Sequence, residues 1–417
     1  MKKLLLLTTL FTLYTHHSNT QWVQQTVPVS KPITGIKFIN ANTGWACTSW
    51  GTGMDTSYIL YTSNGGINWL VQHAALNARY NALSVIDANN IYAGGDSSAR
   101  AKFSKTINGG LNWVDIQTPV NMSIEDMVFQ NKDSGWSCSG VVGPDVRTTT
   151  NGGLNWIVRT SGMAQQTHRL FFLNYNTGFC GANSFLYKTT NAGLNWILNS
   201  NFSESVASIF FMNQATGWLG LSGGKVALTS NGGANWFIQQ PFPLNGNTTT
   251  DIYFINSNTG FAGTGWFQKI LKTTNGGINW GYQIVPTGSV RISIVDSLNC
   301  WAADLGISHT TNGGGMITYV GINNISTEIP GSFKLHQNYP NPFNPVTNFK
   351  FEIPEYSFVN VTIYDILGRK VKTEVENYLR PGTYRINFYA ANLPSGTYFY
   401  RLTTNNYTET KKMILIK

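Results

Sequence analysis

Charged side chains recur at one position of a repeated apolar strand, and they are the residues of this chain best placed to do chemistry. The residue just before each of seven similar strands is Gly35, Ala82, Asp126, Arg169, Ser208, Asp251 or Arg291. Only 11% of the chain is charged, against a usual ~25%, so charges at four of seven equivalent positions stand out. Carboxylates and guanidinium groups could hold the end of a peptide or a glycan. With the residues one place earlier included, the candidate binding residues are Glu125, Asp126, His168, Arg169, Asp251 and Arg291. The alternative is that these charges stand at strand starts and only face water.

Catalysis is poorly supported by the same residues. A glycosidase needs two opposed carboxylates at a set separation, and residues 21–330 contain only 13 acids. Serine, cysteine and histidine form no nucleophile arrangement, and no phosphate-binding or dinucleotide loop occurs. The four cysteines lack metal-ligand spacing and are expected to be buried free thiols. We therefore expect no catalytic residue, no metal and no cofactor. A converging carboxylate pair or arginine triad would indicate an enzyme, and an apolar mouth would indicate a scaffold.

The strands that must position these charges belong to a repeat with a distinctive turn. Residues 62–69 read "TSNGGINW", and six related strings follow at intervals of 37 to 44 residues. Asn-Gly between two strands is a strong hairpin signal because both residues tolerate positive φ, and the Asn side chain can hold the turn. The tryptophan is expected to wedge between neighbouring sheets. These structural positions are Asn64, Trp69, Asn108, Trp113, Asn151, Trp156, Asn191, Trp196, Asn231, Trp236, Asn275, Trp280 and Asn312.

This period, with four short strands in each unit, predicts an all-β, seven-bladed β-propeller over residues 21–320. In the first blade the expected strands are 36–40, 45–49, 58–63 and 68–72, from the inside outwards. The charged positions then ring one mouth of the central channel. The residue three before each motif Asn is Lys in three blades (Lys105, Lys188 and Lys272), which we interpret as a solvated outer face.

The seventh repeat, "TTNGGGMI", has lost its tryptophan. The segment Gln21 to Gln25, "QWVQQ", matches the outer strands "NWLVQ" and "NWFIQ" but no turn precedes it. We infer that it supplies the outer strand of the seventh blade, with Trp22 as the missing tryptophan, and so closes the ring. The alternative is that residues 316–320 form that strand.

Both ends of the chain carry signals of export. Lys2 and Lys3 precede an apolar core too short to span a bilayer, which predicts a signal peptide over residues 1–20. Later segments are not long and apolar enough to span a membrane. After the repeats, residues 321–333 read as a linker, and residues 334–417 carry short strands and prolines that predict a small Ig-like β-sandwich. Its last strand, ending at Ile416, is expected to be exposed, apolar and suited to edge pairing.

Two resemblances add to these interpretations. The string T-x-N-x-G-x-x-W is similar to the Asp-box (BNR-like) motif of sialidase-like propellers, and the repeats resemble the photosystem II stability/assembly factor type, which implies a structural motif away from the ligand-binding face. The pieces "QNYPNPFNPVT", "VTIYDILGRKV", "LPSGTYFYRL" and "KKMILIK" resemble the type A C-terminal sorting domain of the type IX (Por) secretion system of Bacteroidetes. The residues that carry this second resemblance are Asn338, Pro340, Asn341, Pro342, Phe343, Asn344, Pro345, Gly368, Arg369 and Gly396.

The expected function is non-catalytic binding of a protein or glycan by an exported propeller, at the cell surface or outside the cell. The resemblance implies the type IX machinery as a partner and a route through the periplasm. The alternative is a sialidase-like, carbohydrate-active enzyme. The formal charge of +9 is scattered, so we expect no nucleic-acid partner, and a monomer.

Overall fold

The computed structural model describes residues 21–49, 55–97, 100–118, 123–140, 143–239, 241, 248–265, 268–277, 280–315, 318–319, 323–326, 328–390 and 393–417. The predicted signal peptide, residues 1–20, lies outside them. Every named element of the described part is a β strand. No helix in this part of the chain is long and apolar enough to cross a membrane.

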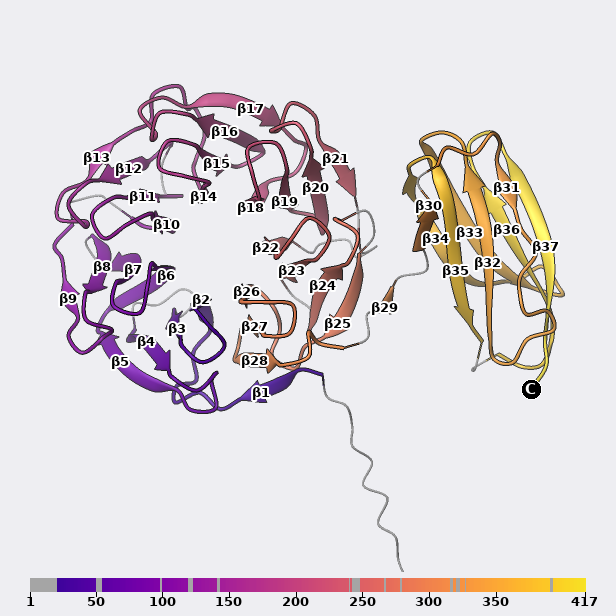
Figure 1. The fold of residues 1–417 in the computed structure, drawn as a ribbon, viewed down its shortest axis with the longest axis horizontal. Helices are drawn as coiled ribbons and strands as arrows, with labels where there is room; N and C mark the ends of the chain where they lie inside the picture. The colour runs from indigo at the N-terminus through magenta and orange to yellow at the C-terminus, as the bar shows by residue number, and fades with distance from the viewer. Residues whose placement is uncertain are drawn as a thin grey trace, which may run out of the picture.

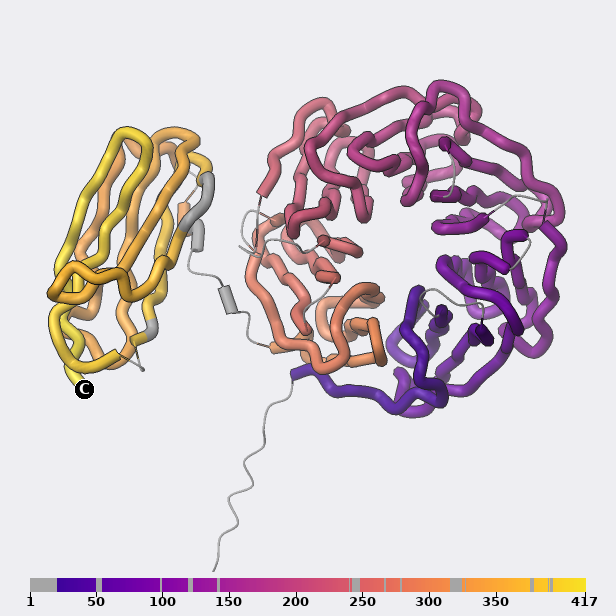
Figure 2. Tube along the Cα trace, turned by 180° about the vertical axis from the view of Figure 1, so that it is seen from behind, coloured from indigo at the N-terminus to yellow at the C-terminus, as the bar shows by residue number. Residues whose placement is uncertain are grey.

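Seven sheets are arranged around a common centre, as Figure 1 shows from one side and Figure 2 from behind. The predicted seven-bladed propeller is therefore confirmed. Blades 1 to 5 have four antiparallel strands in chain order from the channel outwards, blade 6 has a fifth strand at its outer edge, and the outer strand of blade 7 comes from the start of the propeller. Blades 1 to 6 are β2 (Ile33–Phe38), β3 (Gly44–Thr48), β4 (Ser57–Thr62), β5 (Leu70–Ala75); β6 (Ala78–Val85), β7 (Ile91–Ser97), β8 (Ala101–Thr106), β9 (Val114–Asp115); β10 (Asp126–Phe129), β11 (Gly135–Cys138), β12 (Val146–Thr149), β13 (Ile157–Val158); β14 (Arg169–Phe172), β15 (Gly178–Ala182), β16 (Phe185–Thr189), β17 (Ile197–Asn201); β18 (Val206–Phe211), β19 (Gly217–Leu221), β20 (Lys225–Thr229), β21 (Phe237–Gln239); and β22 (Thr249–Phe254), β23 (Gly260–Thr264), β24 (Lys269–Thr273), β25 (Gly281–Ile284). Blade 7 contains β26 (Arg291–Ile294), β27 (Cys300–Ala303) and β28 (Ile307–Thr310).

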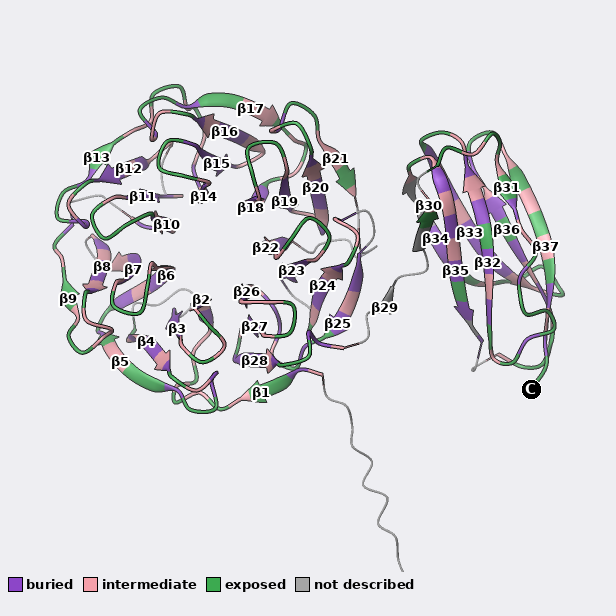
Figure 3. Ribbon diagram, in the orientation of Figure 1, coloured by how far each residue is buried: buried purple, intermediate pink, exposed green. Residues whose placement is uncertain are grey.

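The apolar core lies between neighbouring blades rather than at the centre of the ring. An aromatic residue on the second strand of one blade stacks on a phenylalanine of the inner strand of the next: Trp301 on Phe38 and Trp218 on Phe254, both with ring centroids 3.6 Å apart. Such pairs contribute ~0.5–1.5 kcal/mol beyond area burial. The inner strands are mostly buried and the outer strands mostly exposed (Figure 3). The four cysteines are buried free thiols.

The repeated turn is a clasp built by two side chains. In the first copy the Thr62 hydroxyl donates to Asn64 Oδ1 at 3.0 Å and accepts the Gly66 N–H at 2.9 Å. Asn64 Oδ1 also accepts the N–H of Asn68 at 2.9 Å. The prediction that the asparagine holds the turn is confirmed, but it is wrong about the backbone. Positive φ falls on Gly65 (φ 70°) and Gly66 (φ 91°) and not on the asparagine, because the third and fourth residues after Thr62 form the tight part of the turn.

The outer strand of blade 7 comes from the other end of the propeller. Strand β1 (Val23–Gln25) pairs antiparallel with β28, which confirms the predicted closure. Trp22 is 2% exposed, and its indole N–H donates to Gln283 Oε1 of blade 6 at 3.2 Å. Gln25 Nε2 donates to the Gly65 carbonyl of blade 1 at 2.7 Å. Strand β29 (Thr318–Tyr319) instead adds to the outer edge of blade 6, so the alternative closure is wrong for these residues; residues 316, 317 and 320 lie outside the described part.

Five blades are also fastened by a side chain of their second or third strand to the turn of the following blade, and here the prediction of a solvated face is wrong for two of the three lysines. Lys105 and Lys272 do not form a solvated face, because their ammonium groups donate to turn carbonyls of the following blade, and burial lowers the pKa of both. They take the place of the indole N–H in blades whose second strand carries tyrosine or phenylalanine instead of tryptophan. The donor–carbonyl pairs are Lys105 Nζ–Gly152 (2.9 Å), Trp136 Nε1–Ala192 (2.9 Å), Trp218 Nε1–Gly276 (3.0 Å), Lys272 Nζ–Gly313 (2.7 Å) and Trp301 Nε1–Gly65 (3.1 Å).

The replacement of the tryptophan indole by a lysine ammonium group can be tested by removing the lysine and then restoring an indole with a second substitution. Lys272→Leu is expected to lower the free energy of unfolding by about 1.5 kcal/mol, since a hydrogen bond from a charged donor is lost. The double variant F261W/K272L reproduces the pair Trp218 and Leu228 of blade 5 and should recover part of that loss. Chemical denaturation of the three proteins measures both effects. A double variant no more stable than K272L would show that the indole does not replace the ammonium group here.

Two four-stranded sheets form the predicted sandwich. They are β30 (Asn323–Ser326), β35 (Gly382–Tyr389), β32 (Val346–Ile353) and β31 (Lys334–Leu335), and β34 (Lys370–Leu379), β33 (Ser357–Asp365), β36 (Gly396–Thr403) and β37 (Thr408–Leu415). Strand β30 pairs with β35, so part of the predicted linker 321–333 belongs to this domain. Its core lies between the two sheets and includes Phe343, which is 2% exposed.

The last strand is not the free apolar edge that its sequence suggests. Met413 and Leu415 face the core and are at most 1% exposed. The edge of β37 is covered by the "YPNPF" segment: the Phe343 N–H donates to the Ile414 carbonyl and its carbonyl accepts the Ile416 N–H, both at 2.9 Å. Asn341 Oδ1 accepts the Ile414 N–H at 2.9 Å. Edge pairing at the apolar end of β37 is thus already satisfied within the chain.

Candidate functional site

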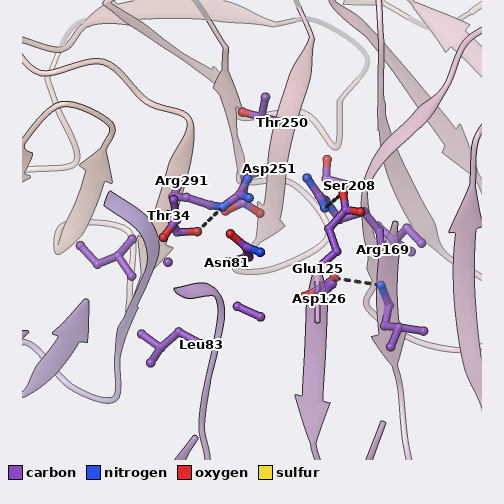
Figure 4. A pocket seen from close by; sticks show the side chains of 15 residues that line it. Thr34, Asn81, Leu83, Glu125, Asp126, Arg169, Ser208, Thr250, Asp251 and Arg291 are labelled. Atoms are coloured by element: carbon purple, nitrogen blue, oxygen red, sulfur yellow. Dashed lines mark hydrogen bonds and ion pairs between the residues drawn. The ribbon is translucent and has the colours of Figure 1, made fainter. Parts of the chain in front are cut away.

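The predicted mouth positions converge on one cavity. All seven residues of the predicted column line a space of about 220 Å³ at one end of the channel, and Figure 4 shows its polar side chains around that space. Asp126, Arg169 and Arg291 open their inner strands, whereas Gly35, Ala82, Ser208 and Asp251 lie within theirs, because these strands begin earlier than predicted. A second cavity of about 350 Å³ shares Thr34, Asn81, Glu125, Arg169 and Arg291 with it and extends towards Arg79 and Asp96. The mouth is therefore polar and not an apolar plug: two arginines and three carboxylates line the first cavity, and Arg79 and Asp96 add a third arginine and a further carboxylate in the second.

The two mouth aspartates connect neighbouring blades. Asp126 Oδ2 accepts the N–H of Leu170 in blade 4 at 2.9 Å, and its Oδ1 accepts the N–H of Met127 at 2.8 Å. Asp251 repeats this arrangement with Ile292 of blade 7 and with Ile252, each at 3.0 Å. Burial raises the pKa of both carboxyls, and the nearby arginines and the N–H donors oppose that rise. These aspartates therefore hold adjacent inner strands in register, which the sequence did not reveal.

The two arginines do the same in the next gap between blades. Arg169 Nε donates to the Ala207 carbonyl of blade 5, and Arg291 Nε donates to the Thr34 carbonyl of blade 1, both at 2.7 Å. The Nη1 groups bond to carbonyls at the starts of their own strands. Burial lowers the pKa of Arg291, and the charge of Arg169 lowers it further. In the described part of the chain, the Nη2 group of each arginine makes no hydrogen bond and is left to a ligand or water.

Glu125 and His168 form a pair at the rim. His168 Nδ1 lies 3.0 Å from Glu125 Oε2, and Arg169 Nη1 lies 3.5 Å from Glu125 Oε1. The hydrogen bond to Glu125 raises the pKa of His168 above its ordinary 6.5. Gly140 makes the pair possible, because a Cβ there would come within 1.9 Å of Glu125 Oε2. All six predicted binding residues thus lie together at the mouth, and the simple view of charges that only face water does not describe them.

The Glu125–His168 pair predicts a pH dependence of stability. The raised pKa means that this contribution is full below the unfolded value of about 6.5 and is lost as the pH rises through the folded value. Because both side chains are about one third exposed, we expect only about 0.5–1 kcal/mol. Denaturation at pH 6 and pH 8 should show this loss in the wild type and a smaller one in His168→Gln. Burial lowers the pKa of His309 to about 4, so His309 stays neutral over this range. An equal loss of stability in the wild type and in His168→Gln would contradict the assignment of the pH dependence to His168.

Aromatic side chains line the channel below the mouth, and the sequence analysis missed them. Phe171, Phe210 and Tyr253 come two residues after the mouth positions, so strand alternation places them on the same face. Their neighbouring ring centroids are 5.8 and 4.9 Å apart, and Lys37 Nζ lies 5.6 Å from the Tyr253 ring. Burial lowers the pKa of Lys37. The sequence signal that could have found these aromatic residues is their constant spacing of two residues after a mouth position.

The three mouth carboxylates are all held by hydrogen bonds or ion pairs within the protein. Both oxygens of Asp126 and Asp251 accept backbone N–H groups, and both oxygens of Glu125 have partners. A general acid or base needs an oxygen within hydrogen-bond reach of its substrate. Among the described residues, no group of three or more His, Cys, Asp or Glu side chains could hold a metal ion.

Comparison with known proteins separates the two parts of the chain. Residues 337–417 match the family model "Secretion system C-terminal sorting domain". No curated protein sequence matches the chain. This domain confirms the predicted resemblance and means that the protein is exported through the type IX system to the cell surface or the extracellular space.

Solved structures share the propeller fold. YCF48 bound to D1 peptide has a TM-score of 0.58 at 18% identity and covers 71% of this chain and 96% of its own. YCF48 from Cyanidioschyzon merolae has a TM-score of 0.57 at 15% identity, with coverage of 71% and 100%. PorZ, a surface component of the type-IX secretion system of Porphyromonas gingivalis, has a TM-score of 0.51 at 12% identity, with coverage of 94% of this chain and 61% of its own. At these identities the likeness shows the fold alone.

Proposed function

We propose that the propeller is a non-catalytic binding module that holds an extended end or segment of a protein ligand at the channel mouth, after export by the sorting domain. The observation that carries this proposal is the convergence of two arginines, each with a free Nη2 group, on one cavity. Guanidinium groups bind carboxylates and carbonyls with directional hydrogen bonds. The aromatic wall formed by Phe171, Phe210 and Tyr253 would contact apolar side chains of the ligand.

A similar fold has been solved with a peptide bound, YCF48 with D1 peptide, which supports a peptide as the class of ligand. The second candidate is a carbohydrate-active enzyme. A structure titled as an ancestral GH74 enzyme shares the fold, with a TM-score of 0.55 at 12% identity and coverage of 94% of this chain and 63% of its own. Against it, both oxygens of Asp126 and of Asp251 accept backbone N–H groups, and one oxygen of each binds the following blade.

The proposal predicts a loss of binding when the arginines are replaced. With ligands selected from a peptide library by the full-length protein, R169A/R291A is expected to bind about 10- to 100-fold more weakly, as expected when hydrogen bonds to charged groups are removed. Binding constants measured by calorimetry check this. A glycan array and hydrolysis assays on the same protein test the alternatives, and glycan cleavage would contradict a non-catalytic module.

The control must separate ligand contact from the support that both arginines give to neighbouring blades. Arg147→Ala removes an arginine that pairs with Asp145 on β12, outside the residues that line the mouth cavities, and should bind as the wild type does. R169K/R291K keeps the charges but loses the forked donors, so its binding should fall between the two. Unchanged binding by R169A/R291A with an unchanged melting temperature would remove the mouth as the site.

A further inference from the structure

The four sorting-domain pieces that are separate in the sequence meet at one end of the sandwich. Strand β37, from the last piece, lies between Asn341 of the first piece and β36 of the third, since Gly396 is opposite Leu415. Strand β36 pairs in turn with the end of β33 in the second piece, where Asp365 is opposite Tyr398. The chain terminus is marked at this end of the sandwich in Figure 1. A sequence signature that converges on one place marks either a packing centre or a contact surface.

Much of this end is explained by packing, but one turn is not. In the "DILGR" turn, Asp365 Oδ1 accepts the N–H groups of Leu367 and Arg369, both at 2.9 Å, and Gly368 supplies a φ of 75°. These residues account for the shape of the turn. The side chains of Ile366 and Leu367 do not contribute to it, and they are 70% and 72% exposed. These two apolar side chains are exposed to water, which is unfavourable, and they do not stabilise the fold.

A basic and aromatic row continues from this turn across the sheet. Lys370 is opposite Tyr364, Tyr364 is opposite Phe399, and Phe399 is opposite Lys412. Residues directly opposite one another on neighbouring strands share a face. Both lysines are exposed and both rings are partly exposed, and the row contains no acid. We name Ile366, Leu367 and this row the sorting surface.

We propose that the sorting surface binds an acidic protein surface of the type IX secretion machinery, with Ile366 and Leu367 inserted in an apolar slot. Two lysines without an acid favour an acidic partner, and the exposed pair supplies the apolar contact at the centre. Strand addition to the apolar end of β37, the other obvious mode, is closed because Asn341 and Phe343 already bond to the backbone of Ile414 and Ile416 there. This proposal is independent of the ligand bound by the propeller.

Export of the full chain in a bacterium with a type IX system tests the proposal. I366S/L367S and K370E/K412E are each expected to reduce the exported fraction by about tenfold and to leave the protein in the periplasm, since each variant loses half of the contact. Matched controls are Ile329→Ser, 72% exposed, and Lys334→Glu, also exposed; both lie outside the matched segment. The controls should be exported as the wild type is.

Folding is checked by the melting temperature of each purified full chain. If I366S/L367S has a lower melting temperature than the wild type, the export of K370E/K412E becomes the test of the proposal, because this variant alters only exposed charges. Normal export of a stable I366S/L367S, or of K370E/K412E, overturns the proposal, and so does an equal loss in the controls. Wild-type binding to phosphatidylglycerol vesicles that both variants lose would assign the surface to a membrane and would also overturn it.

Discussion

Trp22→Ala is expected to lower the free energy of unfolding of the propeller by about 3–5 kcal/mol, the range for truncating a buried large aromatic side chain. Trp22 is 2% exposed and packs in the core between blades 6 and 7. Its indole N–H also donates to Gln283, which in turn donates to the carbonyls of Gly313 and Gly315 at 3.1 Å. The substitution therefore opens a cavity and leaves a buried amide short of a partner at the seam of the ring.

Deleting residues 21–26 should have a larger effect than W22A, because the edge of β28 would lose its partner strand and Gln25 would no longer bind the turn of blade 1. Calorimetric melting of the full chain measures both changes. Val23→Ser is the control on the same strand, since Val23 is 57% exposed and its replacement should leave the melting temperature nearly unchanged. A deletion variant that melts at the wild-type temperature would refute the shared closure of the ring.

Removing the sorting domain is expected to abolish export across the outer membrane and to leave the propeller folded in the periplasm. The cut belongs after residue 322 and not after residue 333, because β30 is part of the sandwich and a remnant of that sheet would expose an unpaired strand. The propeller should survive because its seven blades are closed without the sandwich. Cell fractionation with a periplasmic marker measures the distribution, and the melting temperature of the truncated protein reports its fold.

The matched control is the full chain with the R169A/R291A substitutions, which alter the propeller and not the sorting domain and should still be exported. Surface display of the chain ending at residue 322 would show that export does not depend on the sorting domain. Loss of export together with aggregation would instead mean that the propeller needs the sandwich to fold, and the melting measurement distinguishes this from a sorting defect.

The strand order of the propeller could be predicted because the information is local and repeated. The turn "TSNGGINW" contains everything its clasp needs, namely Thr62, Asn64 and two glycines, within five residues. Its seven copies report the number of blades, and the unmatched "QWVQQ" reports the closure. Strand bounds were less accurate: the inner strand of blade 1 begins at Ile33 and not at Ile36, because the backbone continues to pair with β3 across a register shift as far as the buried Ile33.

The sequence predicted which residues lie at the mouth, but it did not predict their hydrogen-bond partners. The column of residues at strand starts converges as the ring geometry requires. What Asp126 and Arg169 touch depends on residues 38 to 44 positions away, such as Leu170 and Ala207, and nothing local in the sequence specifies those pairs. The exposure of Lys105 and Lys272 was misjudged for the same reason, since their partners are turns of the following blade.

The sequence by itself determined the fold class, the number of blades, the way the ring closes and the destination of the protein, because each of these is written in short contiguous motifs. Only the tertiary structure showed that the charged mouth residues join the blades while two guanidinium groups keep free donors. It alone showed that "YPNPF" covers the last strand, so that Met413 and Leu415 face the core. The physical reason is that burial and hydrogen-bond pairing are properties of neighbours in space, and these neighbours are distant along the chain.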